Sequence, residues 1–448
     1  MRSWSRACVV LVWLSGMGLP VGAQTLVQWY RQGVTQDPSV RAAMAVQQQA
    51  AARMDITLSG TKPQISLSLD RRENRLNVSS AETDYFSTNQ TLDIRQPLFR
   101  GDLAVRLEQD EWAVREAAWS LEQARRDYAV RLAGALLNDV LLRAQLDLAR
   151  STQAQAGQLL HAAQAAFQAG VGVVTDVDEA RARLDLANAD LAQIEVQSAH
   201  AWRLLQSLVA GPMQALRLNP QAQGDALFVL DQTPSALLAE AEPMQAQLSM
   251  LRARQQAAQL ELSRIARAAL PTVDAVAVWQ RSRSENVFNP QGRYRNQQVG
   301  VQLNWPLYQG GRSSAEQALA QAKVEALQAQ IDGARLELLQ KLESHAQTLV
   351  NAPKRLQALR QVSASAQAAL TSSQRARQAG SRTLADVARA TVRVQQAKRD
   401  ELDGQLRALM AYVQLAALTA PDLEAALDAL SAWLVPAPAT EATISAGG

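Results

Sequence analysis

The sequence predicts a mainly helical, internally duplicated chain with a smaller membrane β-barrel part. Three observations point to this fold class: a repeat of ordered motifs, two very long helical segments, and four segments in which apolar and polar residues alternate. Of the 448 residues, 48% are hydrophobic but only 4% are aromatic. This composition is typical of long helices that pack closely, rather than of a bulky globular core.

The N-terminus predicts export from the cytoplasm. Two arginines, the apolar run Ala7–Leu14 and small residues before Ala23 make residues 1–23 a signal peptide. The single cysteine, Cys8, lies inside it, so the mature chain is expected to hold no disulfide and no cysteine-based metal site. No later stretch approaches the roughly 20 apolar residues that a membrane-spanning helix needs.

The chain looks duplicated, because three pairs of motifs recur in the same order at nearly one offset. Each pair lies 208 to 210 residues apart. Chance matches would not keep both the order and the spacing. The pairs are 63–69 with 271–277, 96–101 with 305–310, and 168–177 with 378–387.

Each half is expected to run helix, two strands, very long helix, turn and shorter helix. The halves are 24–209 and 235–420, with a Pro- and Gly-containing linker at 210–234 and a disordered tail at 421–448. The predicted helices cover about 25–58, 103–169 and 176–209, and then about 235–268, 312–379 and 385–418.

The strand segments show a period of two. Ile65, Leu67 and Leu69 alternate with polar residues, and the segment from Val299 to Leu303 does the same. Such alternation is typical of barrel strands with apolar residues outward, and equally of a soluble half-buried sheet. The long helices favour the barrel, because a rod of about 67 residues spans roughly 100 Å, which no compact domain needs.

The second long helix carries a coiled-coil seam that ends in a stutter, which locally unwinds the supercoil. Nearly straight helices of this kind suit the wall of a wide cylinder. The seam residues are Val324, Leu327, Ile331, Ala334, Leu338, Leu342, His345 and Leu349.

Four strand candidates cannot close a barrel, because membrane barrels need at least about eight strands to avoid open edges in lipid. Two copies of the chain could close one. Three copies would give twelve strands and a wider bore.

The segments Pro306–Gly311 (PLYQGG) and Thr175–Val177 (TDV), together with the duplication, resemble the TolC family of outer-membrane efflux and secretion proteins. The resemblance covers nearly the whole mature chain. It implies a homotrimer with a shared twelve-stranded barrel in outer-membrane lipid and a helical tunnel through the periplasm. It also implies two partners, a periplasmic adaptor and an inner-membrane transporter, which is an ABC transporter or a proton-driven pump.

The resemblance also implies a gate at the turns marked by Gly170 and Gly380. In the family, an Asp after the first turn bonds to an Arg and a Tyr near the second turn of a neighbouring helix pair. By motif position the Asp is Asp176, beside Thr175, and the Arg is Arg382. The tyrosine position holds Arg377, which replaces a phenol with a second cation.

The family lines its constriction with two Asp residues one turn apart. Here the first is Asp386, but the second position holds Arg389. We therefore expect a less negative constriction, with Arg382 and Arg389 paired to Asp386 at i,i+4 and i,i+3 spacing. The residues alone also allow a simpler role, since Asp176 and Asp386 each begin a helix whose dipole favours a carboxylate.

The expected function is a passive outer-membrane export duct for proteins, as in type I secretion. A drug or metal efflux outlet is the alternative, and the absence of a lipid-anchor cysteine favours secretion only weakly. A periplasmic coiled-coil structural or adaptor protein is a second alternative.

No enzyme, cofactor or metal site is expected. The three histidines, His161, His200 and His345, stand apart from one another, and no Gly-rich phosphate loop is present. A net charge of +3 with no clustered basic face argues against a nucleic-acid partner.

Overall fold

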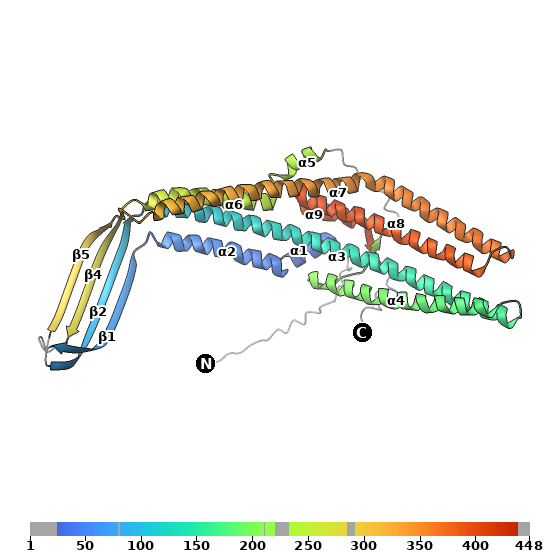
Figure 1. Cartoon of the computed structure of the whole chain (residues 1–448), viewed down its shortest axis with the longest axis horizontal. Helices are drawn as coiled ribbons and strands as arrows, with labels where there is room; N and C mark the ends of the chain where they lie inside the picture. The colour runs from blue at the N-terminus through green and yellow to red at the C-terminus, as the bar shows by residue number, and fades with distance from the viewer. Residues whose placement is uncertain (1–24, 79–80, 210, 220–232, 285–291, 438–448) are drawn as a thin grey trace, which may run out of the picture.

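The computed structural model describes residues 25–78, 81–209, 211–219, 233–284 and 292–437. The predicted signal peptide, residues 1–23, lies outside the described residues. The molecule is an elongated rod with a four-stranded sheet at one end and two helical hairpin turns at the other (Figure 1). Within the described ranges, no helix is both long enough and apolar enough to cross a membrane.

The first half begins with two helices, runs out into a strand pair and returns in a long helical hairpin. Its elements are α1 (Leu26–Val34), α2 (Pro38–Ser59), β1 (Gln64–Val78), β2 (Ala81–Phe99), α3 (Leu103–Gln168) and α4 (Val174–Leu208). The second half repeats this order after the short strand β3 (Leu216–Leu218). Its elements are α5 (Pro234–Ala241), α6 (Ala246–Ala268), β4 (Thr272–Ser284), β5 (Gly292–Asn304), α7 (Arg312–Gln378) and α8 (Leu384–Thr419).

The single helices predicted at 25–58 and 235–268 are each broken in two. In the first half, Pro38 opens α2 and Asp37 caps it, with Asp37 Oδ1 accepting from the amides of Ser39 at 3.0 Å and Val40 at 3.2 Å. Proline has no amide proton and is favoured in the first helical turn, so the chain restarts there. Pro243 lies in the corresponding break between α5 and α6.

The sheet is antiparallel throughout, in the order β1-β2-β4-β5, so the β2–β4 pair joins the two halves. The predicted fold class, mainly helical with four antiparallel strands and an internal duplication, is confirmed. Apolar side chains on one face are open to the surroundings: Ile65 is 68% exposed, Val299 90% and Val301 68%. β1 and β5 are the two edges of this sheet.

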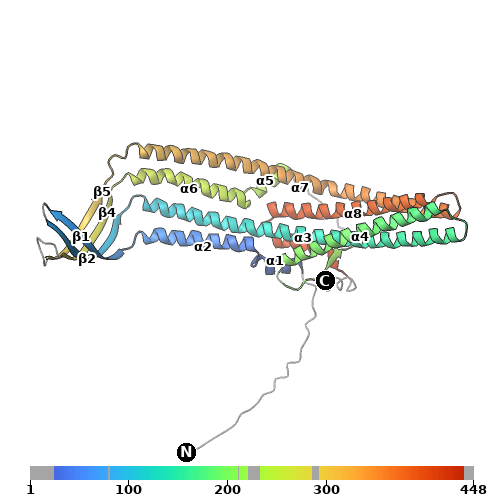
Figure 2. The same ribbon diagram turned by 60° about the horizontal axis from the view of Figure 1, so that its bottom comes forward.

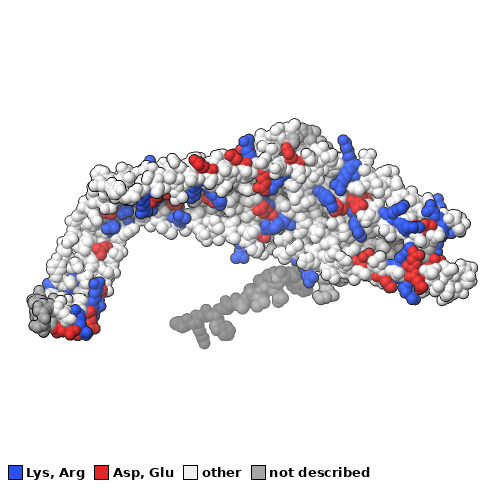
Figure 3. All heavy atoms as spheres, in the orientation of Figure 1, with Lys and Arg blue, Asp and Glu red and all other residues white. Residues whose placement is uncertain are grey.

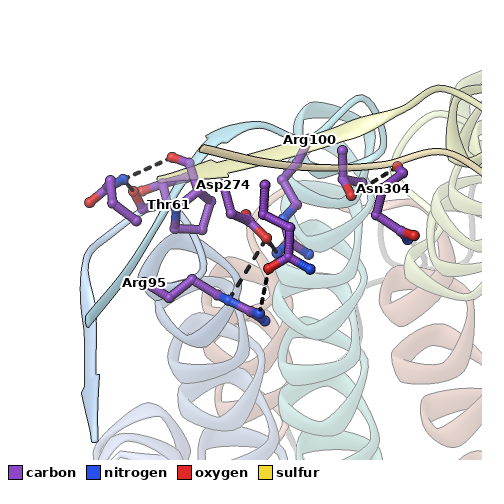
Figure 4. Close-up of polar contacts among 9 residues, drawn as sticks. Thr61, Arg95, Arg100, Asp274 and Asn304 are labelled. Atoms are coloured by element: carbon purple, nitrogen blue, oxygen red, sulfur yellow. Dashed lines mark hydrogen bonds and ion pairs between the residues drawn. The ribbon is translucent and has the colours of Figure 1, made fainter. Parts of the chain in front are cut away.

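A polar network fastens the sheet to the helices (Figure 4). Asp274 of β4 is buried and accepts from Arg100 at 3.0 and 3.2 Å, while Arg95 Nε lies 3.9 Å from the same carboxylate. Gln96 donates to the carbonyl of Thr61 at 2.8 Å. Since Arg100 precedes α3 and Thr61 follows α2, these contacts hold both helices against the sheet.

The main core lies midway along the rod, where α1, α3, α8 and the C-terminal helix meet (Figure 2). Tyr128, Leu132, Leu409 and Leu427 are all fully buried in it. Along the rest of α3 and α7, most of the buried side chains are alanines and leucines. The predicted seam residues Leu327, Ile331, Leu338, Leu342 and Leu349 are buried.

The prediction of a disordered tail from residue 421 is wrong for residues 423–436. They form α9 (Leu423–Ser431) and β6 (Leu434–Pro436), and β6 pairs with β3 inside the predicted linker. Leu423, Leu427 and Leu430 recur at helical spacing and bury against the main core, and Arg31 of α1 reaches Glu424 at 2.5 Å. The proline- and glycine-rich stretch that suggested disorder begins only after these elements.

Candidate gate at the helical tips

The two hairpin turns lie side by side at the end of the rod farthest from the sheet (Figure 1). Gly170 and Gly380 adopt left-handed φ values of 75° and 76°. The amide that follows each glycine reaches back into the helix, Val171 to Ala166 O at 3.0 Å and Ser381 to Ala376 O at 2.9 Å. These are matched Schellman turns, so the duplicated motif gives both hairpins the same tip geometry.

Asp386 is engaged within its own helix. Its Oδ2 accepts from the Thr383 hydroxyl at 2.8 Å and from the Thr383 amide at 3.1 Å, and its Oδ1 accepts from Arg389 at 2.7 Å. The Thr383 hydroxyl accepts in turn from the Asp386 amide, which completes a capping box. The hydrogen bonds from Thr383, followed by that from Arg389, lower the pKa of Asp386 to about 2.

The expected Arg382–Asp386 pair does not form, whereas the Asp386–Arg389 pair does. Arg382 precedes the N-cap Thr383, so it lies outside the helical register that i,i+4 contact requires. Its side chain is exposed. Arg377 lies in the last turn of α7, on the groove between the two hairpins.

The corresponding start of α4 has no such side-chain cap. Its N-cap is Val173, which offers no side-chain acceptor, and Asp176 takes part only through its amide, 3.1 Å from Val173 O. Thr175 is exposed and Asp176 half-buried. Within the described part of the chain, no hydrogen bond or ion pair reaches the Asp176 carboxylate or joins it to Arg382.

A groove of about 1350 Å³ runs between the hairpins behind the tips. Arg377 and Arg389 line it, and so do three basic residues that the motif comparison did not identify: Arg183, Arg393 and Lys398. One acidic residue, Asp190, lies among them. Arg389 and Arg393 are four residues apart on α8, so their shared helix face was readable from the sequence.

The comparisons with known proteins identify the family of the chain. The family model described as "Outer membrane efflux protein" matches residues 29–211 and 237–420. The chain is 24% identical to the outer membrane protein TolC of Vibrio cholerae, over 90% of this chain and 92% of that protein. It is 25% identical to the proteases secretion protein PrtF of Dickeya chrysanthemi, over 98% and 97% respectively.

A solved structure of CusC superposes with a TM-score of 0.73 at 16% identity, covering 88% of this chain and 92% of that one. At this identity the superposition shows the fold alone. The family match extends over both halves and over the tips, and the family is one of channels rather than enzymes. The chain therefore belongs to the outer membrane efflux protein family, and it is a TolC-like channel subunit of the outer membrane.

Proposed function

We propose that the chain forms the outer-membrane duct of a protein-exporting system of the type I kind. One observation supports this proposal most directly. The chain matches PrtF, a relative named for protease secretion, over almost the entire length of both proteins. The duct is passive, and an inner-membrane ABC transporter joined through a periplasmic adaptor supplies the energy. The alternative is that the chain is the outlet of a proton-driven pump that expels drugs or metals. The word "efflux" in the family description favours this alternative.

The sheet supports an assembly of three copies, which family membership also implies. The edge strands β1 and β5 have no further strand beside them within the described chain. In lipid, each unpaired backbone group is costly, so the edges must be covered. β5 of one copy pairing with β1 of the next closes a ring, and three copies of a four-stranded sheet give twelve strands.

The helices support the same ring. On the sheet side, neighbours run α2, α3, α6, α7, and on the tip side α4, α3, α8, α7. The free flanks are therefore α7 on one side and α2 with α4 on the other. Apolar side chains stay exposed on these outer helices, which suits a wall built from copies of the same chain. They include Val46, Ile56, Leu186, Val196, Leu319, Leu336 and Val362.

The gate we propose is a contact between Asp176 of one copy and Arg382 of the next, with Thr175 and Arg377 beside it. Both charged side chains lie at the tips, and neither has an ion-pair partner in the described part of its own chain. Asp386, by contrast, is already held by Thr383 and Arg389. The sheet end then opens to the outside, while the tips close the periplasmic end of the duct.

Planar-bilayer conductance tests the duct and its gate together. Wild-type trimers should give small, stable channels, and Asp176→Ala with Arg382→Ala should widen them. The matched control is Asp147→Ala with Arg150→Ala, which removes an ion pair 3.9 Å long in α3 away from the tips. Absence of channels in the wild type would refute the duct, and equal conductance in all three would refute the gate.

The exported class is tested in cells. Removing the chain should deplete specific proteins from the culture medium, and restoring it should return them. If the medium is unchanged but sensitivity to drugs or metals rises, the chain is an efflux outlet instead.

A further inference from the structure

Four arginines gather on one face of the sheet, close to its outer loops. They are Arg71 of β1, Arg281 of β4, and Arg293 and Arg295 of β5, and we call them the arginine belt. All four side chains are exposed. Figure 3 shows charged side chains gathered at this end of the sheet and far fewer between it and the helices.

The strand register places the belt on the outward, apolar face. Side chains two apart on a strand share a face, so Arg71 follows Ile65 to Leu69, and Arg295 and Arg293 follow Val301 and Val299. Leu303 to Arg295 is eight residues. At about 3.3 Å each this is roughly 26 Å along the strand, enough to cross most of an outward band about 25 Å tall.

The belt sets like charges directly opposite one another. Arg281 faces Arg295 across the β4–β5 ladder, and Arg293 lies two residues farther along β5 on the same face. Direct cross-strand pairs of like charge destabilise a sheet. Among the described residues, an anion bound from outside the chain would relieve this repulsion between Arg281 and Arg295.

Acidic residues of the described chain do not neutralise the arginine belt. Arg71, Arg281, Arg293 and Arg295 make no ion pair within the described chain, and the Arg71 guanidinium instead lies over the Phe86 ring, 4.9 Å from its centroid. Glu73, the next outward-facing residue of β1, makes no ion pair with Arg71 within the described chain. Arg75, two outward-facing positions nearer the loop than Arg71, is by contrast neutralised by Asp84 at 2.9 Å and Glu82 at 3.1 Å.

The inward face at the same height is balanced. There Asp70 and Arg72 form an ion pair at 3.3 Å, and the residues across from them on β2 and β4 are Asn89, Ser282, Ser87 and Ser284. The positive excess is thus confined to the face that meets lipid. A lumenal role in substrate passage would have placed it on the other side.

We propose that the arginine belt binds the phosphate groups of lipopolysaccharide in the outer leaflet of the outer membrane. Guanidinium groups bind phosphate in a bidentate manner and remain charged in all conditions of the cell. The ligand combines phosphates with acyl chains, and the belt lies directly above exposed Leu69 and the other residues of the apolar band. The inference rests on the proposed orientation, with the loops outside and the helices in the periplasm.

Assembly makes the belt continuous. β5 of one copy is the proposed neighbour of β1 of the next, so Arg293 and Arg295 come beside the neighbouring Arg71. On β2, the outward-facing residues at the height of the belt are Thr88 and Gln90, which are uncharged. Lipopolysaccharide at this seam bridges two protomers, so its binding should also tighten the trimer.

The test uses purified full-length trimers in detergent, with diphosphorylated lipid A as the probe and the melting temperature of the trimer as the readout. Lipid A should raise the melting temperature of the wild type. In Arg281→Gln with Arg295→Gln, the half-saturating concentration should rise about tenfold or more. Arg281→Lys with Arg295→Lys should retain most of the affinity, because the charge remains.

The matched control is Arg360→Gln with Arg399→Gln, which removes two exposed arginines from α7 and α8 and should leave the response unchanged. Dephosphorylated lipid A and phosphatidylglycerol should both bind more weakly than lipid A. The proposal is overturned if the Gln variant responds like the wild type, or if either comparison lipid binds as tightly as lipid A. Conductance of the same preparations separates this result from the duct itself, since wild-type channels without a lipid A response would leave the proposed function standing.

Discussion

The hydroxyl of Tyr128 occupies the space in which a Cβ on Gly33 would lie. Tyr128 is fully buried and donates to the carbonyl of Leu208 at 2.7 Å, so one side chain of α3 joins the end of α1 to the end of α4. This contact is at the centre of the main core.

Gly33→Ala should therefore destabilise the protein, because the new methyl group clashes with a side chain that its own hydrogen bond fixes. We expect a loss of roughly 1–3 kcal/mol, as for other overpacked cores. Thermal unfolding followed by circular dichroism measures it. Gly157→Ala in α3 is the matched control, since its Cβ meets nothing within 4 Å, and it should gain about 0.5–1 kcal/mol from higher helix propensity. Equal effects at the two positions would contradict the role of Tyr128.

Arg126 supports the C-terminus of α8 from within the core. Its Nη1 donates to the carbonyls of Ala417 and Ala420, both at 3.0 Å, and the residue is only 8% exposed. Arg126→Met should leave these carbonyls without that donor and cost about 1–3 kcal/mol. Urea unfolding compared with Arg125→Met, the adjacent arginine that makes no ion pair in the described chain, checks the expectation. A loss of the same size in both variants would assign the effect to charge alone.

The capping box of α8 should make its first turn sensitive to acid. The carboxyl of Asp386 has a pKa of about 2, below its ordinary value of 3.8, so the folded state favours the ionised form. Its contribution is complete above about pH 4 and is lost as the pH falls through 2. Hydrogen-exchange protection of the amides of residues 383 and 386, which the capping box binds, should thus fall between pH 4 and 2 in the wild type. In Asp386→Ala the hydrogen-exchange protection of this turn should be low at both pH values. In Asp176→Ala it should be the same as in the wild type.

The Asp386–Arg389 pair should also set how the proposed constriction treats cations. Because Arg389 offsets the carboxylate, a trivalent cation added on the tip side should block wild-type channels only weakly. Arg389→Asp should lower the half-blocking concentration about tenfold or more. Arg399→Asp, with the same charge change farther along α8, is the control. Tight block of the wild type at low concentration would refute a neutralised constriction.

The large-scale fold was readable because its signals are long. A duplication with one offset, rods of 66 and 67 residues and alternating strands each accumulate over many positions, so single substitutions do not hide them. The breaks were missed although their signals were present, since Asp37-Pro38 and Glu242-Pro243 each mark a restart. Helix α9 was missed because its nine residues are short and its neighbours suggested disorder.

The site was predicted in part. Asp386 and Arg389 could be paired from their spacing along one helix, and the Thr383 capping box shows as a sequence pattern. The predicted Arg382–Asp386 pair was wrong because helix α8 begins after Arg382. The Arg100–Asp274 contact joins residues far apart in the sequence, so no local pattern reveals it, and the arginine belt needed the strand register that only the assembled sheet provides.

The pairing of β6 with β3 has a consequence for how the protein is made. Leu434 bonds to a strand that left the translocation machinery more than two hundred residues earlier, and α9 completes the main core just before it. The β3–β6 pair and the main core beside it are therefore incomplete until residues 423–436 have crossed the inner membrane. Chains cut short before this point should keep an exposed apolar surface at mid-length, where the side chains of α9 would otherwise cover the main core.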